Sequence, residues 1–259
     1  MKKNYFWPML IGLLGLLCPA RARAQASVVD LVPDSTDTRY RAIDLNLTLK
    51  NMHLWRGFKV TNAAMAAADL HYTTRDGHFR TGVWGGSGFT GEYREFDYYA
   101  SYSKGRFLVA LWDINNFSSY PDANIFSYDR AGTSHFADLT VAYTLSDKLP
   151  LRVSWSTILL GRDYYTEADG RVKSTFSNYV QLDYPVWHKG SASLSLLAGG
   201  AFAFGRQQSF YAAHPNFTNL GGVYARTLQL GTYEVPVAAT ALWNPEKKYG
   251  ALQVAVTLF

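Results

Sequence analysis

Cysteine, long apolar runs and metal-ligand patterns are scarce in this 259-residue sequence. The single cysteine, Cys18, excludes a disulfide within the chain. No run of 18 apolar residues is present, so the sequence offers no membrane-spanning helix. His135, His188 and His214 lack the spacing of metal ligands, so we expect no metal site and no cofactor. No linker, low-complexity tract or charge block divides the chain, which indicates a single domain.

The amino terminus has the composition of a secretion signal. Two lysines near the start are followed by the apolar run Met9–Leu17, and small residues with the spacing that a signal peptidase needs come next. We therefore predict a signal peptide over residues 1–24, cleaved after Ala24 or, alternatively, after Ala26. The single mature domain is predicted over residues 25–259.

The basic charge of the chain comes from that amino-terminal segment. The sequence has 25 Lys and Arg against 20 Asp and Glu, with a pI of about 9.1. Residues 1–24 hold four of the basic residues and no acid, so the rest of the chain has 21 against 20. A nearly neutral domain gives no reason to expect binding to nucleic acid. Lipidation at Cys18 is an alternative use of the segment, but the bulky Leu17 before it disfavours lipoprotein processing.

The end of the chain has the pattern of a β-strand. Four apolar residues alternate with milder ones before the final Phe259: Leu252, Val254, Val256 and Leu258. A period of two marks a strand with one apolar face. This stretch resembles the closing strand of bacterial outer-membrane β-barrels, whose terminal aromatic residue belongs to the signal read by the barrel-assembly machinery. The apolar set is one residue out of phase with Phe259, which departs from that family's pattern.

Twelve segments carry strand-like patterns, most of them near the 9–11 residues that a tilted strand needs to cross a bilayer. They are 41–51, 64–73, 78–86, 93–102, 107–114, 135–145, 150–160, 174–185, 190–204, 218–230, 235–243 and 250–259. They predict an all-β, antiparallel up-and-down barrel of about 12 strands. Ten strands is the alternative if 107–114 or 235–243 is misread. Alternation does not say which face is inside: a lipocalin-like soluble barrel would turn the apolar face inward, and a transmembrane barrel outward.

Loop lengths favour the transmembrane barrel. Short connections such as 74–77 and 103–106 alternate with longer ones such as 52–63 and 115–134. Tight periplasmic turns and longer external loops would give this alternation.

Aromatic residues, 15% of the sequence, point the same way because they gather near both ends of the strands. Two such belts are typical of a protein that meets two membrane–water boundaries. The belt at the short-turn end is predicted from Tyr72, Phe79, Tyr102, Phe107, Tyr184, Trp187 and Phe259. The belt at the long-loop end is predicted from Trp55, Phe58, Trp84, Phe89, Tyr93, Trp112 and Trp243.

Short motifs carry a further resemblance. They are Leu54–Gly57 (LWRG), Thr81–Gly85 (TGVWG), Glu95–Tyr102 (EFDYYASY) and Val235–Pro245 (VPVAATALWNP). With these, the chain resembles an uncharacterised family of outer-membrane barrel proteins from Gram-negative, Bacteroidetes-like bacteria. The resemblance implies a barrel in the cell outer membrane, in contact with lipid and lipopolysaccharide and assembled by the barrel-assembly machinery. It implies no activity.

If the apolar faces meet lipid, the polar faces meet the lumen, since a charge facing lipid at the midplane costs about 2–4 kcal/mol. The predicted lumen-lining residues are Asp44, Lys50, Asp69, His71, Arg80, Glu95, Asp97, Asp113, Asp138, Arg152, Asp183 and Arg226. A barrel of this size is wider than the eight-stranded size that side chains just fill, which favours a narrow, porin-like channel for small polar solutes. The alternative is a salt-bridged core that plugs the barrel.

Arg56 in the Trp-Arg-Gly motif has two interpretations. It is a pore-mouth candidate that meets phosphate or an anionic solute. Alternatively, Trp55 belongs to the membrane belt, Arg56 bonds to loop carbonyls, and Gly57 supplies the positive φ of a turn.

Two other functions compete with transport. A structural or adhesive surface barrel would use aromatic residues in the loops Asn115–Ser134 and Arg206–Phe217 to bind sugars or partners. A lipid-modifying enzyme would need a nucleophile and base, and His71 with Ser87 is the available pair. These two are expected at opposite ends of the strands, too far apart for a dyad, so we predict no enzymatic activity.

Overall fold

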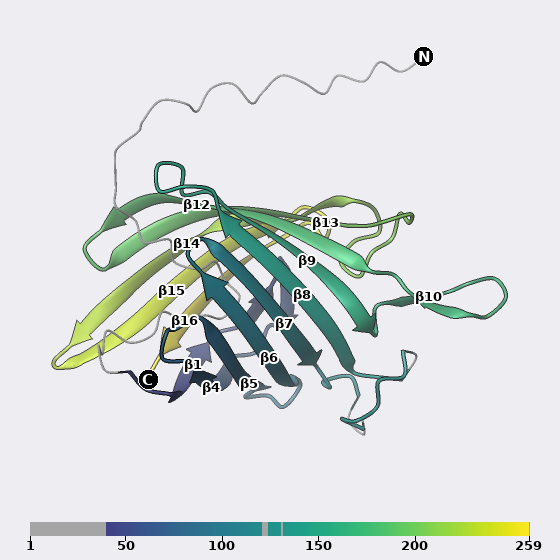
Figure 1. The fold of residues 1–259 in the computed structure, drawn as a ribbon, viewed down its shortest axis with the longest axis horizontal. Coiled ribbons are helices and arrows are strands. Elements are labelled where there is room, and N and C mark those ends of the chain that lie inside the picture. The colour runs from purple at the N-terminus through teal and green to yellow at the C-terminus, as the bar shows by residue number, and fades with distance from the viewer. Residues whose placement is uncertain (1–39, 121–123, 131, 259) are drawn as a thin grey trace, which may run out of the picture.

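The computed structural model describes residues 40–120, 124–130 and 132–258, which form twelve antiparallel strands closed into one barrel (Figure 1). The predicted signal peptide and the terminal Phe259 lie outside the described residues. Within these ranges, no helix is long and apolar enough to cross a membrane.

Each barrel strand pairs with the next barrel strand in the sequence, and the first closes the ring against the last. The strands are β1 (Ile43–Lys50), β4 (Met65–Thr73), β5 (Phe79–Gly88), β6 (Arg94–Lys104), β7 (Phe107–Asn115), β8 (His135–Thr144), β9 (Arg152–Gly161), β12 (Ser177–Lys189), β13 (Ala192–Ala203), β14 (Asn216–Leu230), β15 (Tyr233–Asn244) and β16 (Tyr249–Thr257). Every predicted segment corresponds to one of them. The prediction of twelve strands is therefore confirmed, and the ten-strand alternative is wrong.

Two short hairpins in the long connections were not predicted. β2 (His53–Trp55) pairs with β3 (Phe58–Thr61) between β1 and β4. β10 (Tyr164–Thr166) pairs with β11 (Val172–Ser174) between β9 and β12. In Figure 1 the β10–β11 hairpin projects away from the barrel. The β2–β3 hairpin instead folds into the lumen, as its contacts below establish.

Strand register assigns every barrel residue to one face, because side chains alternate along a strand and paired residues share a face. On β16, Leu252 is 54% exposed, whereas Gln253 is 5% exposed. On β4, Leu70 is exposed and Asp69 is buried in the same way. The apolar face of these strands points outward and the polar face points inward, which contradicts the lipocalin-like alternative.

The predicted aromatic belt at the short-turn end lies on the outer face. Its exposed members are Tyr72, Phe79, Tyr102, Phe107 and Trp187, while Tyr184 is half-buried. The short connections beside them are turns such as residues 105–106 and 231–232.

The predicted belt at the long-loop end is mostly wrong. Phe89 and Trp243 are exposed there, but Trp84 and Tyr93 are buried. The even-numbered parity of β5 and β7 turns Trp84 and Trp112 into the lumen, where they pack together. Trp55 and Phe58 also lie inside, since they belong to the β2–β3 hairpin. Other residues expose aromatic rings at this end: Phe176, Phe204 and Phe217.

Candidate functional site

The β2–β3 hairpin turns at Arg56 and Gly57, which both have positive φ, 48° and 89°. A Cβ atom on residue 57 would lie 1.9 Å from the backbone oxygen of Thr218 on β14. Only glycine fits so close an approach in this backbone conformation. The Gly57 part of the sequence interpretation therefore holds, and it also explains how the turn seats directly against the barrel wall.

Hydrogen bonds fix the hairpin to neighbouring strands β14, β15 and β16. The Gly57 carbonyl accepts from Asn244 Nδ2 at 3.0 Å and from the Tyr249 hydroxyl at 2.8 Å. Gln253 Oε1 accepts from the backbone N–H of Leu54 at 2.9 Å. The Thr218 hydroxyl donates to the Arg56 carbonyl at 3.3 Å. The hairpin's backbone polar groups thus find partners inside the barrel, which is the condition for burying a loop.

Arg56 reaches from the hairpin to the far wall of the lumen. Its Nη1 and Nη2 atoms each donate to one carboxylate oxygen of Asp138 at 2.7 Å, a bidentate pair. Asp138 lies on β8, five strands from β1 in one direction around the ring and seven in the other. Arg56 also donates to the hydroxyls of Tyr211 at 2.5 Å and Thr140 at 3.3 Å. The side chains of Arg56 and Asp138 are 7% and 2% exposed, so each needs the other to offset the cost of burial.

These contacts correct both interpretations of Arg56. The residue lies inside the lumen and not at the pore mouth, and it bonds to a carboxylate and hydroxyls instead of loop carbonyls. Its neighbour Trp55 is not a belt residue either. The guanidinium carbon lies 4.6 Å from the centroid of the Trp55 ring, a cation–π geometry.

An aromatic cluster surrounds the hairpin tip. The Trp55 ring centroid lies 5.7 Å from that of Phe136 on β8 and 5.6 Å from that of Tyr211. Tyr211 and Phe210 come from the connection between β13 and β14, and Tyr211 is 1% exposed. The expectation that these two rings serve surface binding is therefore wrong, because the loop turns them onto the hairpin. Burial of aromatic rings supplies much of the energy that holds such a plug.

Two cavities lie on either side of the hairpin tip. The larger, about 210 Å³, includes Asn116, Arg162 and Phe210 in its lining and so lies toward the long-loop end. The smaller, about 60 Å³, includes Ser101 and Arg152 and lies toward the short turns. Residues that border both cavities form the partition between them: Leu54, Arg56, Trp112 and Thr140.

Ten of the twelve predicted lumen residues have the inward parity. They are Asp44, Lys50, Asp69, His71, Arg80, Glu95, Asp97, Asp138, Arg152 and Asp183. Within this set the structure brings His71 and Asp69 into contact, with His71 Nδ1 3.1 Å from Asp69 Oδ2. The hydroxyl of Tyr99 on β6, which was not predicted, donates to Asp69 Oδ1 at 2.8 Å.

Arg226 is on the outer face, which corrects the prediction. It shares the parity of Tyr224, which is 41% exposed, and it pairs with Val237 on β15. Arg226 lies near the 231–232 turn, where a charged side chain can reach the barrel end.

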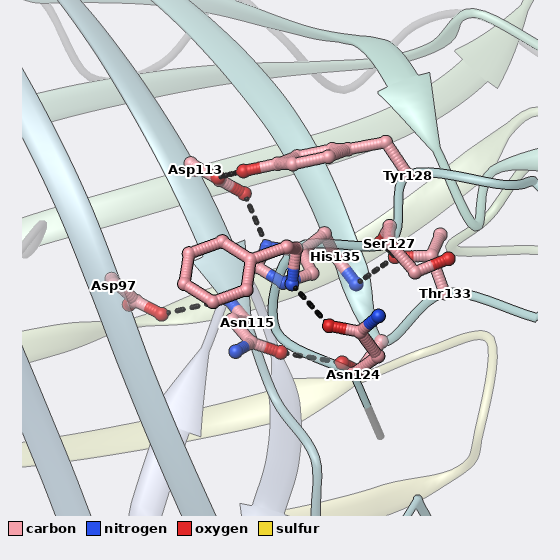
Figure 2. A network of polar contacts seen from close by, with 10 residues as sticks. Asp97, Asp113, Asn115, Asn124, Ser127, Tyr128, Thr133 and His135 are labelled. Atoms are coloured by element: carbon pink, nitrogen blue, oxygen red, sulfur yellow. Dashed lines mark hydrogen bonds and ion pairs between the residues drawn. The ribbon is translucent and has the colours of Figure 1, made fainter.

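Asp113 is also outside the lumen. It shares the parity of the exposed Leu111 and lies opposite Tyr98 on β6. Figure 2 shows how the connection after β7 folds over it: the Tyr128 hydroxyl donates to Asp113, and His135 Nδ1 lies 2.9 Å from Asp113 Oδ1. The hydrogen bond to Asp113, with partial burial, raises the pKa of Tyr128 to about 12. This network anchors the loop.

The structure does not bring His71 and Ser87 together. His71 pairs with Gly82, five residues before Ser87 on β5, and the two side chains point to opposite faces of the sheet. Among residues 40–120, 124–130 and 132–258, no group of three or more His, Cys, Asp or Glu could hold a metal ion.

Sequence reasoning missed the partners that make Arg56 a plug residue. Thr140 and Tyr211 are 84 and 155 residues away from it, and nothing local marks them. One signal was available for the hairpin itself. Apolar and aromatic residues on both sides of a glycine turn are typical of a short hairpin with a buried face.

No protein-family model matches the sequence, and no curated protein matches it.

Proposed function

We propose that this protein is an outer-membrane barrel whose lumen is a narrow passage for small polar solutes, closed in this conformation by the β2–β3 hairpin. The observation that carries the proposal is the hairpin itself. A single chain segment, held by the Arg56–Asp138 ion pair, by hydrogen bonds of its backbone and by aromatic packing, stands between two cavities of the lumen.

The membrane part of the proposal is supported by the outer surface. Large apolar side chains are exposed around the barrel: Leu45, Leu70, Leu111, Leu182, Leu196 and Leu252. Exposed aromatic rings lie beyond them at both ends of the strands. A continuous apolar surface of this kind in water would drive aggregation, whereas lipid solvates it.

The transport part is supported by the inner surface. On the short-turn side of the hairpin, hydrogen bonds connect Tyr179, Gln181 and Asp183 along the wall of the lumen. Gln181 Nε2 donates to Asp183 Oδ1 at 2.8 Å. Such polar groups can replace the hydration of a polar solute. Passage requires the hairpin to move away from the barrel wall, which breaks the Arg56–Asp138 pair together with the hydrogen bonds to Gly57 and the packing of Trp55.

A second function is favoured by the long-loop end. Phe126 is 82% exposed on the connection between β7 and β8, and the β10–β11 hairpin projects beyond the barrel (Figure 1). A barrel with a permanently filled lumen would present these as a binding surface. In that case the hairpin would be a structural core element and would not move.

Conductance in planar bilayers distinguishes the two functions. We expect small or intermittent current from the wild-type protein and larger, steady current from a variant in which residues 53–61 are replaced by a short glycine–serine linker. The matched control replaces the projecting segment 164–174 in the same way and should conduct like the wild type. Protease resistance and circular dichroism verify that each variant is folded. Absence of current from all folded variants would overturn the transport proposal in favour of the filled barrel.

A further inference from the structure

We propose that Lys189 and Arg226, on the outer face of the barrel near its short-turn end, bind the phosphate headgroup of an anionic phospholipid. This inference rests on the membrane part of the proposed function and is independent of transport. It is tested by lipid preference, so that it can fail while the membrane location holds.

A β-bulge on β12 places Lys189 on the outer face. Before the bulge the odd-numbered side chains of β12 point inward, and Asp183 is 8% exposed. The register with β13 then shifts immediately before Trp187, which reverses the parity of the residues that follow. Trp187 pairs with Leu194, which shares the outward parity of the exposed Leu196, and Trp187 is 44% exposed. The bulge thus brings an aromatic ring and a cation to the outer surface.

Arg226 joins the same row of paired residues from the other side. Ala192 on β13 pairs with Lys189 on β12 and with Arg226 on β14. Paired residues share a face, so both cations have the outward parity of Leu194. Adjacent strands are about 4.8 Å apart, which puts the Cα atoms of the two cations roughly 10 Å apart. Both side chains are exposed, and the short side chain of Ala192 does not separate them. Their charged groups can therefore approach one phosphate.

No acidic side chain shares this outer surface with the two cations. The strands β12 to β15, which all lie within the described residues, contain only two acidic residues, Asp183 and Glu234. Asp183 is buried in the lumen, and Glu234 has the inward parity, opposite to that of the two cations. In the turn before β9, Asp147 is paired with Arg106 at 2.9 Å. Two positive charges in one row therefore favour an anion between them.

The neighbouring outer surface suits the rest of a phospholipid. In the next row toward the middle of the strands, Leu194 lies between Trp187 and Tyr224, which are 44% and 41% exposed. Trp and Tyr rings are typical of the membrane–water boundary, where lysine and arginine attract anionic lipids. Both cations donate charge-assisted hydrogen bonds to phosphate oxygens. The site thus offers cations to the headgroup and apolar surface to the chains.

Exposed cations at the long-loop end are placed differently. In the β10–β11 hairpin, Lys173 Nζ lies 2.8 Å from Glu167 Oε1, and Arg171 lies 3.1 Å from the other oxygen of Glu167. Lys247 and Lys248 are exposed, but they directly follow Glu246 in the turn between β15 and β16. An acidic neighbour accompanies each of these cations, so they are suitable controls.

The test is quenching of Trp187 fluorescence by brominated phospholipids. Trp155→Phe and Trp243→Phe leave Trp187 as the only exposed tryptophan among the described residues. The full chain with these two changes is reconstituted in phosphatidylcholine vesicles that contain brominated phosphatidylglycerol or, at the same mole fraction, brominated phosphatidylcholine. We expect stronger quenching by the anionic lipid at low salt and a smaller difference at high salt, because salt screens exposed charges. Lys189→Gln and Arg226→Gln should each reduce the preference for phosphatidylglycerol about five-fold, and the double variant should lose it.

The matched control is Lys247→Gln with Lys248→Gln, which removes two exposed cations from the opposite end and should keep the preference. Equal quenching by both lipids, or a preference that persists without Lys189 and Arg226, would overturn the inference and leave the membrane location standing. If neither lipid quenches Trp187, the membrane part of the proposed function is wrong and this site is wrong with it. If soluble glycerol phosphate abolishes the preference, the site takes a free phosphate and the assignment to a lipid is overturned.

Discussion

The two unpredicted hairpins lie in long connections at the same end of the barrel. The β2–β3 hairpin folds into the lumen, whereas the β10–β11 hairpin projects away from the barrel (Figure 1). The β2–β3 hairpin carries Leu54, Trp55, Phe58 and Val60, which pack against the interior. The β10–β11 hairpin carries charges that pair with each other, such as Lys173 Nζ with Glu167 Oε1 at 2.8 Å. Apolar side chains need a surface to bury against, and exposed ion pairs do not. Composition thus decides which hairpin becomes the plug.

The largest expected effect comes from breaking the Arg56–Asp138 ion pair, which only the β2–β3 hairpin makes. Arg56→Ala leaves Asp138 buried without its bidentate partner. Loss of one member of a buried pair costs about 3–5 kcal/mol. We expect this decrease in the free energy of unfolding, measured by urea titration in lipid vesicles.

The double variant Arg56→Leu with Asp138→Leu is the control for that prediction. It removes both charges, so it should recover most of the lost stability. A decrease below 1 kcal/mol for Arg56→Ala would contradict the view that this ion pair holds the plug.

The next prediction compares the glycine turns of the two hairpins directly. Gly57→Ala and Gly170→Ala both place a Cβ at positive φ, 89° and 84°, which costs about 1–2 kcal/mol. Only the Cβ atom at residue 57 adds a clash, because it would lie 1.9 Å from the backbone oxygen of Thr218. A Cβ atom at residue 170 would have no other atom within 4 Å. Overpacking adds about 1–3 kcal/mol, so Gly57→Ala should be the more destabilising substitution by that amount. Equal unfolding midpoints for the two variants would show that the inner turn is not tightly seated.

The smallest expected effect comes from the outer hairpin. Lys173→Ala removes the ion pair with Glu167, which is solvent-exposed on the lysine side. Exposed pairs of this kind contribute little to stability. We expect no measurable change in unfolding midpoint or in conductance. A clear loss of stability would mean that the β10–β11 hairpin is packed against the barrel after all.

The barrel strands were predictable because their signal is local. Alternation on β1 and β16 identifies a strand from a few consecutive residues, and turn-length alternation identifies the two ends of the barrel. The prediction of lumenal residues was wrong where the strict alternation of inward and outward side chains along a strand was not applied. Asp113 and Arg226 were assigned to the lumen by charge alone, although each shares the parity of exposed outer-face residues.

The aromatic residues near the long-loop end show a second kind of failure. Trp84 and Trp112 lie near the ends of the predicted segments 78–86 and 107–114, as membrane-belt residues would. In the structure they lie within β5 and β7, and their parity directs them inward. Phe210 and Tyr211 occur in a loop like surface residues, but the loop folds back onto Trp55. In both cases position along the chain was a weaker guide than the surface available for burial.

By itself the sequence determined the strands, their number and the alternation of their faces, because these depend on neighbouring residues and on a period of two. Only the tertiary structure decided that one loop fills the lumen, that Arg56 meets Asp138 across 82 residues of sequence, and that a cavity lies on the long-loop side of the hairpin. Those features depend on closing the ring of strands, which brings opposite walls within reach of one side chain. No local pattern encodes the distance across a closed barrel.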